Sequence, residues 1–208
     1  MNNFLSSLRE LPRTVWLVGL VSFCNDATSE LIYPLLPLYL ASVLMAGPKT
    51  LGIIEGIAEA TGSLIKLLAG VLSDRRRSVK PWVVGGYALA ALARPLLALA
   101  SSWPLVLALR FADRVGKGLR SSPRDALLAL TVTAHTRGLA FGLHRSLDNA
   151  GAVVGPLLAA WLLAAAVPLP TIFLASALGG VLAVSLALAI REPARQPVVP
   201  GKSLPEWR

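Results

Sequence analysis

Charged residues are scarce in this sequence of 208 residues, of which Asp, Glu, Lys and Arg together make up only 15%. A soluble domain carries about 25% charged residues and roughly 45–50% apolar residues. The present chain is 55% apolar, and its mean hydropathy is +0.65. This composition excludes an ordinary soluble globule and indicates a membrane protein.

Cysteine, histidine and enzyme motifs are also missing or rare. The single Cys24 excludes a disulfide framework within the chain, and His135 and His144 lack the spacing of a metal site. The sequence has no G-x-S-x-G elbow, no Walker-type phosphate loop and no H-E-x-x-H motif. We therefore expect no enzyme, no ATP-driven pump, no cofactor and no metal.

The basic residues give a net charge of +9, but they lie in short clusters between apolar runs. They do not form the continuous basic surface, interleaved with aromatic residues, that is typical of nucleic-acid binding. We expect no nucleic-acid partner.

Long apolar runs are abundant, and six of them have about 20 residues or more, the length that crosses a hydrocarbon core of about 30 Å. We predict membrane spans at residues 14–45, 50–72, 81–101, 104–127, 138–166 and 170–190. The first run is longer than a bilayer needs, and Pro34 and Pro37 should kink it. It also exceeds the apolar region of a signal peptide, so we expect a retained first helix.

Basic residues between the spans predict the orientation of the chain. They lie at the N-terminus, in the second break, around the end of the fourth span and after the sixth: Arg9, Arg13, Arg75, Arg76, Arg77, Lys80, Arg120, Arg124, Arg137, Arg191, Arg195, Lys202 and Arg208. The other breaks contribute only Lys49. We expect a cytoplasmic N-terminus at residues 1–13, a transmembrane bundle at 14–191 and a disordered cytoplasmic tail at 192–208.

Charged residues within the spans are the candidate functional groups, because each costs at least about 2.5–3.5 kcal/mol at bilayer depth unless it faces a partner or water. Asp26 and Glu30 share a helix face, and Glu55 and Glu59 repeat their spacing. The candidates for a proton or substrate pathway are Asp26, Glu30, Glu55, Glu59, Arg94, Arg110, Asp113, Arg114, Arg145 and Asp148.

Two roles are open to these residues. They either form a static lattice of ion pairs that locks the helices together, or they line a pathway for protons or substrate. We expect Asp26, Glu30 and Glu59 to serve the pathway, because carboxylates at similar depth repel one another and favour proton uptake by at least one of them.

Three sequence patterns point to a family. The break after the second span reads Gly70-Val-Leu-Ser-Asp74-Arg75-Arg76-Arg77-Ser-Val-Lys80. The fourth span carries Arg110 with Gly116 six residues later, and the fifth carries Gly151-x-x-x-Gly155-Pro156. The first resembles the cytoplasmic signature of the major facilitator superfamily of transporters, although Arg77 stands where that signature usually has Gly. The second partly matches the family's fourth-helix pattern, and the third resembles its exporter or antiporter branch.

The resemblance implies an all-α membrane protein in which six transmembrane helices form a 3+3 inverted repeat, one half of a major facilitator fold. It implies a secondary active transporter half-unit in the bacterial inner membrane, exporting a small solute by proton-coupled alternating access. The second six-helix unit would be another copy of the chain or a companion chain, unless the chain is a fragment of a longer protein. A non-transporting membrane subunit that stabilises or regulates a partner is the alternative.

By the same resemblance, Gly70, Asp74 and Arg75 belong to a cytoplasmic latch against the inner end of the fourth span. Arg124 and Asp125 are the candidate partners there, and a basic anchor that only sets topology is the alternative.

Gly151, Gly155 and Pro156 are expected to serve helix packing or gating, since small residues spaced by four let helix backbones approach closely. The charge of the solute stays open, because acids on the first two spans favour a cation whereas Arg94 and Arg110 favour an anion.

Overall fold

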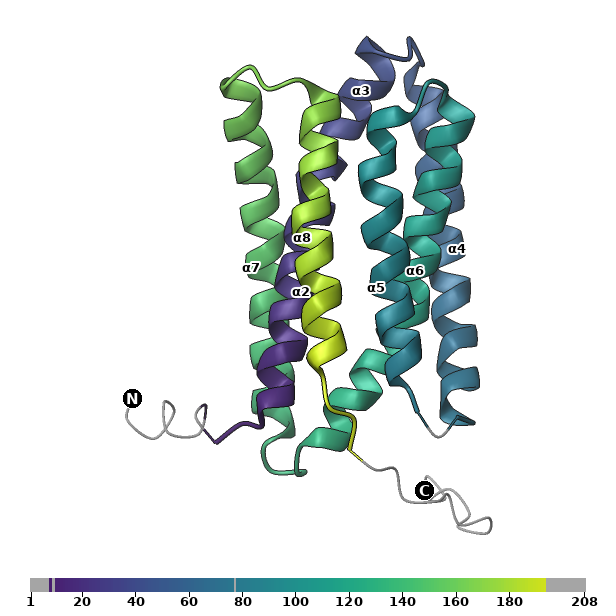
Figure 1. The fold of residues 1–208 in the computed structure, drawn as a ribbon. Helices are drawn as coiled ribbons and strands as arrows, with labels where there is room; N and C mark the ends of the chain where they lie inside the picture. The colour runs from purple at the N-terminus through teal and green to yellow at the C-terminus, as the bar shows by residue number, and fades with distance from the viewer. Residues whose placement is uncertain (1–7, 9, 77, 194–208) are drawn as a thin grey trace.

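The computed structural model describes residues 8, 10–76 and 78–193, and most of these residues are helical with no strand among them. The elements, labelled as in Figure 1, are α2 (Arg13–Ile32), η1 (Tyr33–Leu35), α3 (Leu36–Ser42), α4 (Pro48–Asp74), α5 (Lys80–Leu96), η2 (Leu97–Leu99), α6 (Trp103–Thr131), α7 (Arg137–Ala164) and α8 (Leu169–Ala189). The all-α prediction is therefore confirmed for the described part of the chain. Arg9, Arg77, Arg195, Lys202, Arg208 and most of the tail predicted to be disordered lie outside it.

Prolines set several helix boundaries. Pro48, Pro81, Pro104 and Pro170 occupy the first positions of their helices, where the N–H that proline lacks would have no helical partner. The first span is interrupted as predicted: the α-helix ends at Ile32, a 3₁₀ turn follows, and the helix resumes at Leu36.

The fourth span differs from its prediction. Helix α6 continues to Thr131, beyond the expected end at residue 127. Arg120 and Arg124, which were counted with the cations around the end of this span, lie inside the helix, Arg120 buried and Arg124 partly buried.

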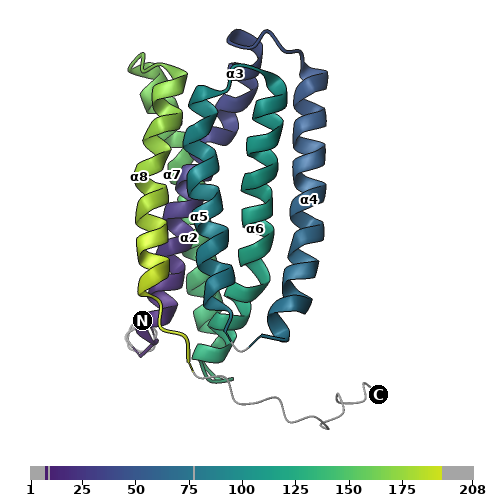
Figure 2. The same cartoon turned by 45° about the vertical axis from the view of Figure 1, so that its right-hand side comes forward.

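The helices form two side-by-side groups, α2 with α7 and α8, and α4 with α5 and α6 (Figure 1). Packing runs in the spatial order α4, α6, α5, α8, α2, α7, so α4 and α7 lie at opposite edges, as the turned view also shows (Figure 2). Helix α2 begins and α8 ends at the same end of the bundle, where the Thr14 hydroxyl donates to the Arg191 carbonyl at 3.4 Å.

Glycines allow the closest helix contacts. A Cβ on Gly86 of α5 would lie 2.5 Å from the carbonyl oxygen of Gly116 on α6. On the other side, a Cβ on Gly155 of α7 would lie 2.5 Å from the carbonyl oxygen of Ala27 on α2, and a Cβ on Gly151 would meet that of Phe23. The pairs α5–α6 and α2–α7 therefore pack backbone against backbone.

Three helical segments of the described chain are long and apolar enough to cross a membrane, namely Lys80–Leu99, Arg137–Ala164 and Leu169–Ala189. Helices α2, α4 and α6 are as long, but acidic and basic residues in their interiors lower their hydropathy. Between α5 and α8, small residues leave an apolar groove of about 480 Å³ lined by Leu92 and Val181 among others. Charge is thus concentrated on α2, α4, α6 and α7, away from the α5–α8 surface.

The two adjacent glycines of α5 provide a matched test of the backbone contact. We expect Gly86→Ala to destabilise the fold by about 1–3 kcal/mol, because the added methyl group meets backbone that cannot rotate away. Gly85 has nothing within 4 Å, so Gly85→Ala should be neutral or stabilising by up to about 1 kcal/mol. Unfolding of the detergent-solubilised protein measures both, and equal effects would contradict the packing described.

Candidate functional site

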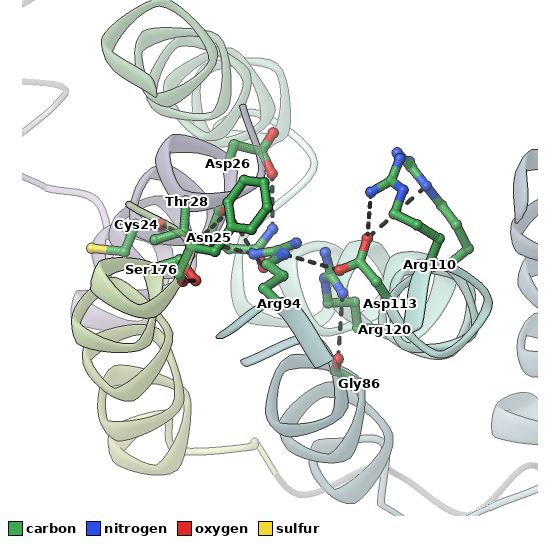
Figure 3. A network of polar contacts seen from close by, with 12 residues as sticks. Cys24, Asn25, Asp26, Thr28, Gly86, Arg94, Arg110, Asp113, Arg120 and Ser176 are labelled. Atoms are coloured by element: carbon green, nitrogen blue, oxygen red, sulfur yellow. Dashed lines mark hydrogen bonds and ion pairs between the residues drawn. The ribbon is translucent and has the colours of Figure 1, made fainter. Parts of the chain in front are cut away.

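Asp113 on α6 is the centre of the charged interior, and it is only 3% exposed. Its Oδ1 accepts a hydrogen bond from Arg94 Nε of α5 at 2.9 Å, and its Oδ2 lies 3.5 Å from Arg110 Nη1. Figure 3 shows these two guanidinium groups on either side of the carboxylate. One buried acid is therefore shared by two buried bases, and the attraction between them is strong because water is excluded.

Arg94 extends this centre to helix α2. Its Nη1 donates to the backbone and side-chain oxygens of Asn25 at 2.9 and 3.0 Å, and to the Thr28 hydroxyl at 2.9 Å (Figure 3). Arg94 thus joins α5, α6 and α2. Asn25 and Thr28 were not among the predicted site residues, although both lie one helical turn or less from Asp26.

Arg110 extends the centre in the other direction, to α4. Its Nε and Nη2 each donate to one oxygen of Glu55 at 2.9 Å, the two-pronged geometry that makes Arg–carboxylate pairs strong and directional. One turn further along, Arg114 Nη1 lies 3.4 Å from Glu59, whose side chain is 67% exposed. The structure therefore brings together the predicted acids of α4 and the predicted bases of α6.

A second cluster lies toward the end where α2 begins. Arg124 Nη2 is 3.1 Å from Asp125 and its Nη1 is 3.9 Å from Asp148 of α7, which also lies 3.6 Å from Arg145. Arg124 Nη1 also donates to the Ser22 hydroxyl at 3.3 Å.

Ser22 in turn lies 2.9 Å from Nε2 of the buried His144. In the sequence, His144 is a lone histidine and gives only weak evidence of a functional site. Only the fold places it in this cluster.

Arg120 is the buried cation that the sequence analysis missed. It is 3% exposed, its Nη1 donates to the Gly86 carbonyl at 3.3 Å, and its guanidinium lies 4.7 Å from the centre of the Tyr87 ring. No carboxylate of the described residues lies within ion-pair distance of it. The available signal was helical periodicity, because Arg120 follows Asp113 by seven residues and so shares its face.

Two of the predicted acids differ from the rest. Glu55, Glu59, Asp113 and Asp148 all take part in ion pairs, whereas Asp26 and Glu30 make none with the described residues. The only hydrogen bond of the Asp26 carboxylate within the described chain comes from the Asn25 amide at 2.9 Å. Asn25 also accepts hydrogen bonds from Arg94, so Asp26 lies next to the charged network without an ion pair of its own.

The residues of the predicted latch lie apart from one another. Asp74 and Arg75 are exposed at the end of α4, while Arg124 and Asp125 pair with each other, and no ion pair links these two sets of described residues. Gly70 instead packs beside Ser122 of α6. The latch stays a prediction.

Glycines of α7 make the α2 contact described above, and Pro156 lies within α7 without ending it. This geometry describes packing, and a gating role stays a prediction.

The described residues include no group of His, Cys, Asp and Glu suited to hold a metal ion. What the arrangement offers chemically is a set of acids and bases inside the bundle, most of them joined in ion pairs.

Comparison with known proteins places this charged bundle in a family. A model of the Major Facilitator Superfamily matches residues 18–207. The chain belongs to the major facilitator superfamily. Members of this superfamily are integral membrane transporters rather than enzymes, which agrees with the resemblance seen in the Gly70–Lys80 segment.

Relatives within the superfamily include an uncharacterised MFS-type transporter of Methanocaldococcus jannaschii, 38% identical over 72% of this chain and 37% of its own length. An uncharacterised protein of Mycobacterium tuberculosis is 35% identical over 73% of this chain and 37% of its own length. Multidrug resistance protein MdtH of Photorhabdus laumondii is 32% identical over 64% of this chain and 33% of its own length. The matched region thus spans about a third of the length of these relatives.

The buried acid of this superfamily member gives a direct stability test. Asp113→Asn leaves Arg94 and Arg110 without their shared charge, and we expect it to destabilise the fold by about 3–5 kcal/mol. Glu59→Gln removes an acid that is 67% exposed and lies 3.4 Å from the buried Arg114, so its effect should be clearly smaller, about 1 kcal/mol. Unfolding in detergent compares the two, and a similar small effect for both would show that Asp113 does not hold the helices together.

Proposed function

We propose that this chain is a six-helix unit of a proton-coupled secondary transporter that exports a small solute. The observation that carries the proposal is the contrast among the acids: Asp26 and Glu30 have no ion-pair partner in the described chain, whereas the other four do. An acid held by a fixed cation stays ionised, while an acid without one is free to gain and lose a proton.

Asp26 is the acid we assign to proton coupling. Its carboxylate accepts a hydrogen bond from Asn25, whose own oxygens accept from Arg94, so an ionised Asp26 places a negative charge beside the network centred on Asp113. Protonation removes that charge. A single proton therefore changes which helices attract one another, and this change biases the equilibrium between outward-open and inward-open states.

We further propose that the six helices are a 3+3 inverted repeat. In such a repeat, α2 corresponds to α6, α4 to α7 and α5 to α8. The α2–α7 contact then corresponds to the α6–α4 contact, and the α2–α8 contact to the α6–α5 contact. All four contacts occur, which supports this symmetry. The polar faces of α2, α4, α6 and α7 then need a second six-helix unit, a copy or a companion, to keep lipid from their charges.

The orientation and direction of transport are part of the same proposal. Arg75, Arg76, Lys80, Arg137 and Arg191 lie at the end of the bundle where α2 begins, which supports a cytoplasmic position for that end. The name of the MdtH relatives, multidrug resistance protein, supports export, and a bacterial inner membrane is the expected location.

Asp26→Asn should abolish proton coupling, because the amide can neither bind nor release a proton at this position. In liposomes containing this chain together with its second six-helix unit, an imposed pH gradient should drive flux of a solute that is first identified with a panel of charged compounds. The variant should lose the response to the gradient. Glu10→Gln, an exposed acid just before α2, is the matched control and should retain it.

A spectroscopic measurement makes this test independent of the solute. Acidification should produce the infrared C=O stretch of a protonated carboxylic acid in the parent protein, and Asp26→Asn should remove part of that band. Flux indifferent to the gradient, together with an unchanged band in Asp26→Asn, would overturn the proposal.

Asp74→Asn tests the proposed cytoplasmic latch. A latch residue is needed in one state of the transport cycle only, so this variant should change the transport rate by several-fold while membrane insertion and abundance stay at the level of the parent. Lys80→Gln, in the same basic segment, serves as the control for topology. An Asp74→Asn variant with unchanged transport would assign the segment to topology alone.

A further inference from the structure

We propose that the hollow between α4 and α6 is a binding site for an oxyanion group, either carboxylate, phosphate or sulfate. The hollow has a volume of about 170 Å³, and its lining includes Lys66, Arg114, Lys117, Glu59 and the serines Ser63 and Ser121. Three bases and one acid give it a net charge of +2 at neutral pH. This inference goes beyond the proposed function, because binding is measured without transport or a pH gradient.

Arg114 is the buried cation of this hollow. The residue is 6% exposed, yet its side chain makes no hydrogen bond to the described residues, and its buried Nε has no acceptor among them. Its nearest carboxylates are Glu59, 3.4 Å from Nη1, and Asp113, 4.0 Å from Nε. Charge-assisted hydrogen bonds are about 2.7–2.9 Å long, so Arg114 is under-compensated compared with Arg94 and Arg110.

The two lysines add charge that no acid in the described chain neutralises. Lys66 and Lys117 are exposed and form no ion pair with the described residues, although each contributes to the lining of the hollow. Glu59, the single acid, is mostly exposed and already shared with Arg114. A small anion would therefore meet three donors and one repelling carboxylate.

Packing makes the hollow a fixed feature. A Cβ on Gly118 of α6 would lie 2.8 Å from the Gly62 carbonyl of α4, so the helices touch here and hold the bases on both sides in place.

Two sources supply this chemistry, a soluble anion and the headgroup of an anionic lipid. Inorganic phosphate and sulfate probe the first, and vesicles of phosphatidylcholine with or without phosphatidylglycerol probe the second. Calorimetry of the purified chain in an uncharged detergent measures binding of phosphate and sulfate. The same measurement on the chain in vesicles shows whether phosphatidylglycerol displaces these anions.

Charge variants on either side of the hollow give the decisive comparison. Lys66→Gln and Lys117→Gln should each weaken phosphate or sulfate binding about ten-fold, the loss of one charged contact. Glu59→Gln should strengthen it, because the variant removes the repelling charge and frees Arg114. Lys49→Gln, at the opposite end of α4, is the control and should leave binding unchanged.

Each outcome decides the proposal. Displacement by phosphatidylglycerol identifies a headgroup site, and binding that resists the lipid identifies a site for a soluble anion. Absence of binding to the parent by every probe overturns the proposal, as does equal weakening by Lys49→Gln, or weaker binding in Glu59→Gln. None of these results bears on Asp26 and proton coupling, so the two proposals fail separately.

Discussion

The carboxylate of Asp113, buried between the guanidinium groups of Arg94 and Arg110, is the interaction on which the rest of the structure depends. Through Arg94 it reaches Asn25 and Thr28 on α2, and through Arg110 it reaches Glu55 on α4. Four helices thereby share one buried junction. Because an unpaired charge in this position is so unfavourable, the junction specifies which helix faces lie inside.

The acids near this junction fall into two groups, those held in ion pairs and those without one. Acids that contact it or Arg124 are held by cations, whereas Asp26 and Glu30 lie beside it without a cation of their own in the described chain. Backbone contact between α2 and the glycines of α7 keeps these two acids close to the network. A rigid centre with two acids outside its ion pairs would suit the proposed transporter, which changes state without losing its packing.

Much of the fold could be predicted from the sequence, because apolar runs and prolines act locally. All six predicted spans correspond to long helical segments, and Pro34 and Pro37 interrupt the first as expected. The pairing of charges could not be predicted, since it depends on the spatial order of the helices, which places α6 between α4 and α5. Arg120 was counted with the cations around the end of the fourth span, and its burial beside Tyr87 depends on the α5–α6 contact. The burial of His144 likewise depends on the α2–α7 contact.

We expect the charged faces of α2, α4, α6 and α7 to border water rather than lipid. Single cysteines in a Cys24→Ser background, labelled in intact membranes with a water-soluble thiol reagent, test this expectation. Cysteines replacing Glu59 and Lys117 should react readily, whereas cysteines replacing Leu92 and Val181 in the apolar groove should not. Equal labelling of the two pairs, or preferential labelling of the groove, would contradict the account.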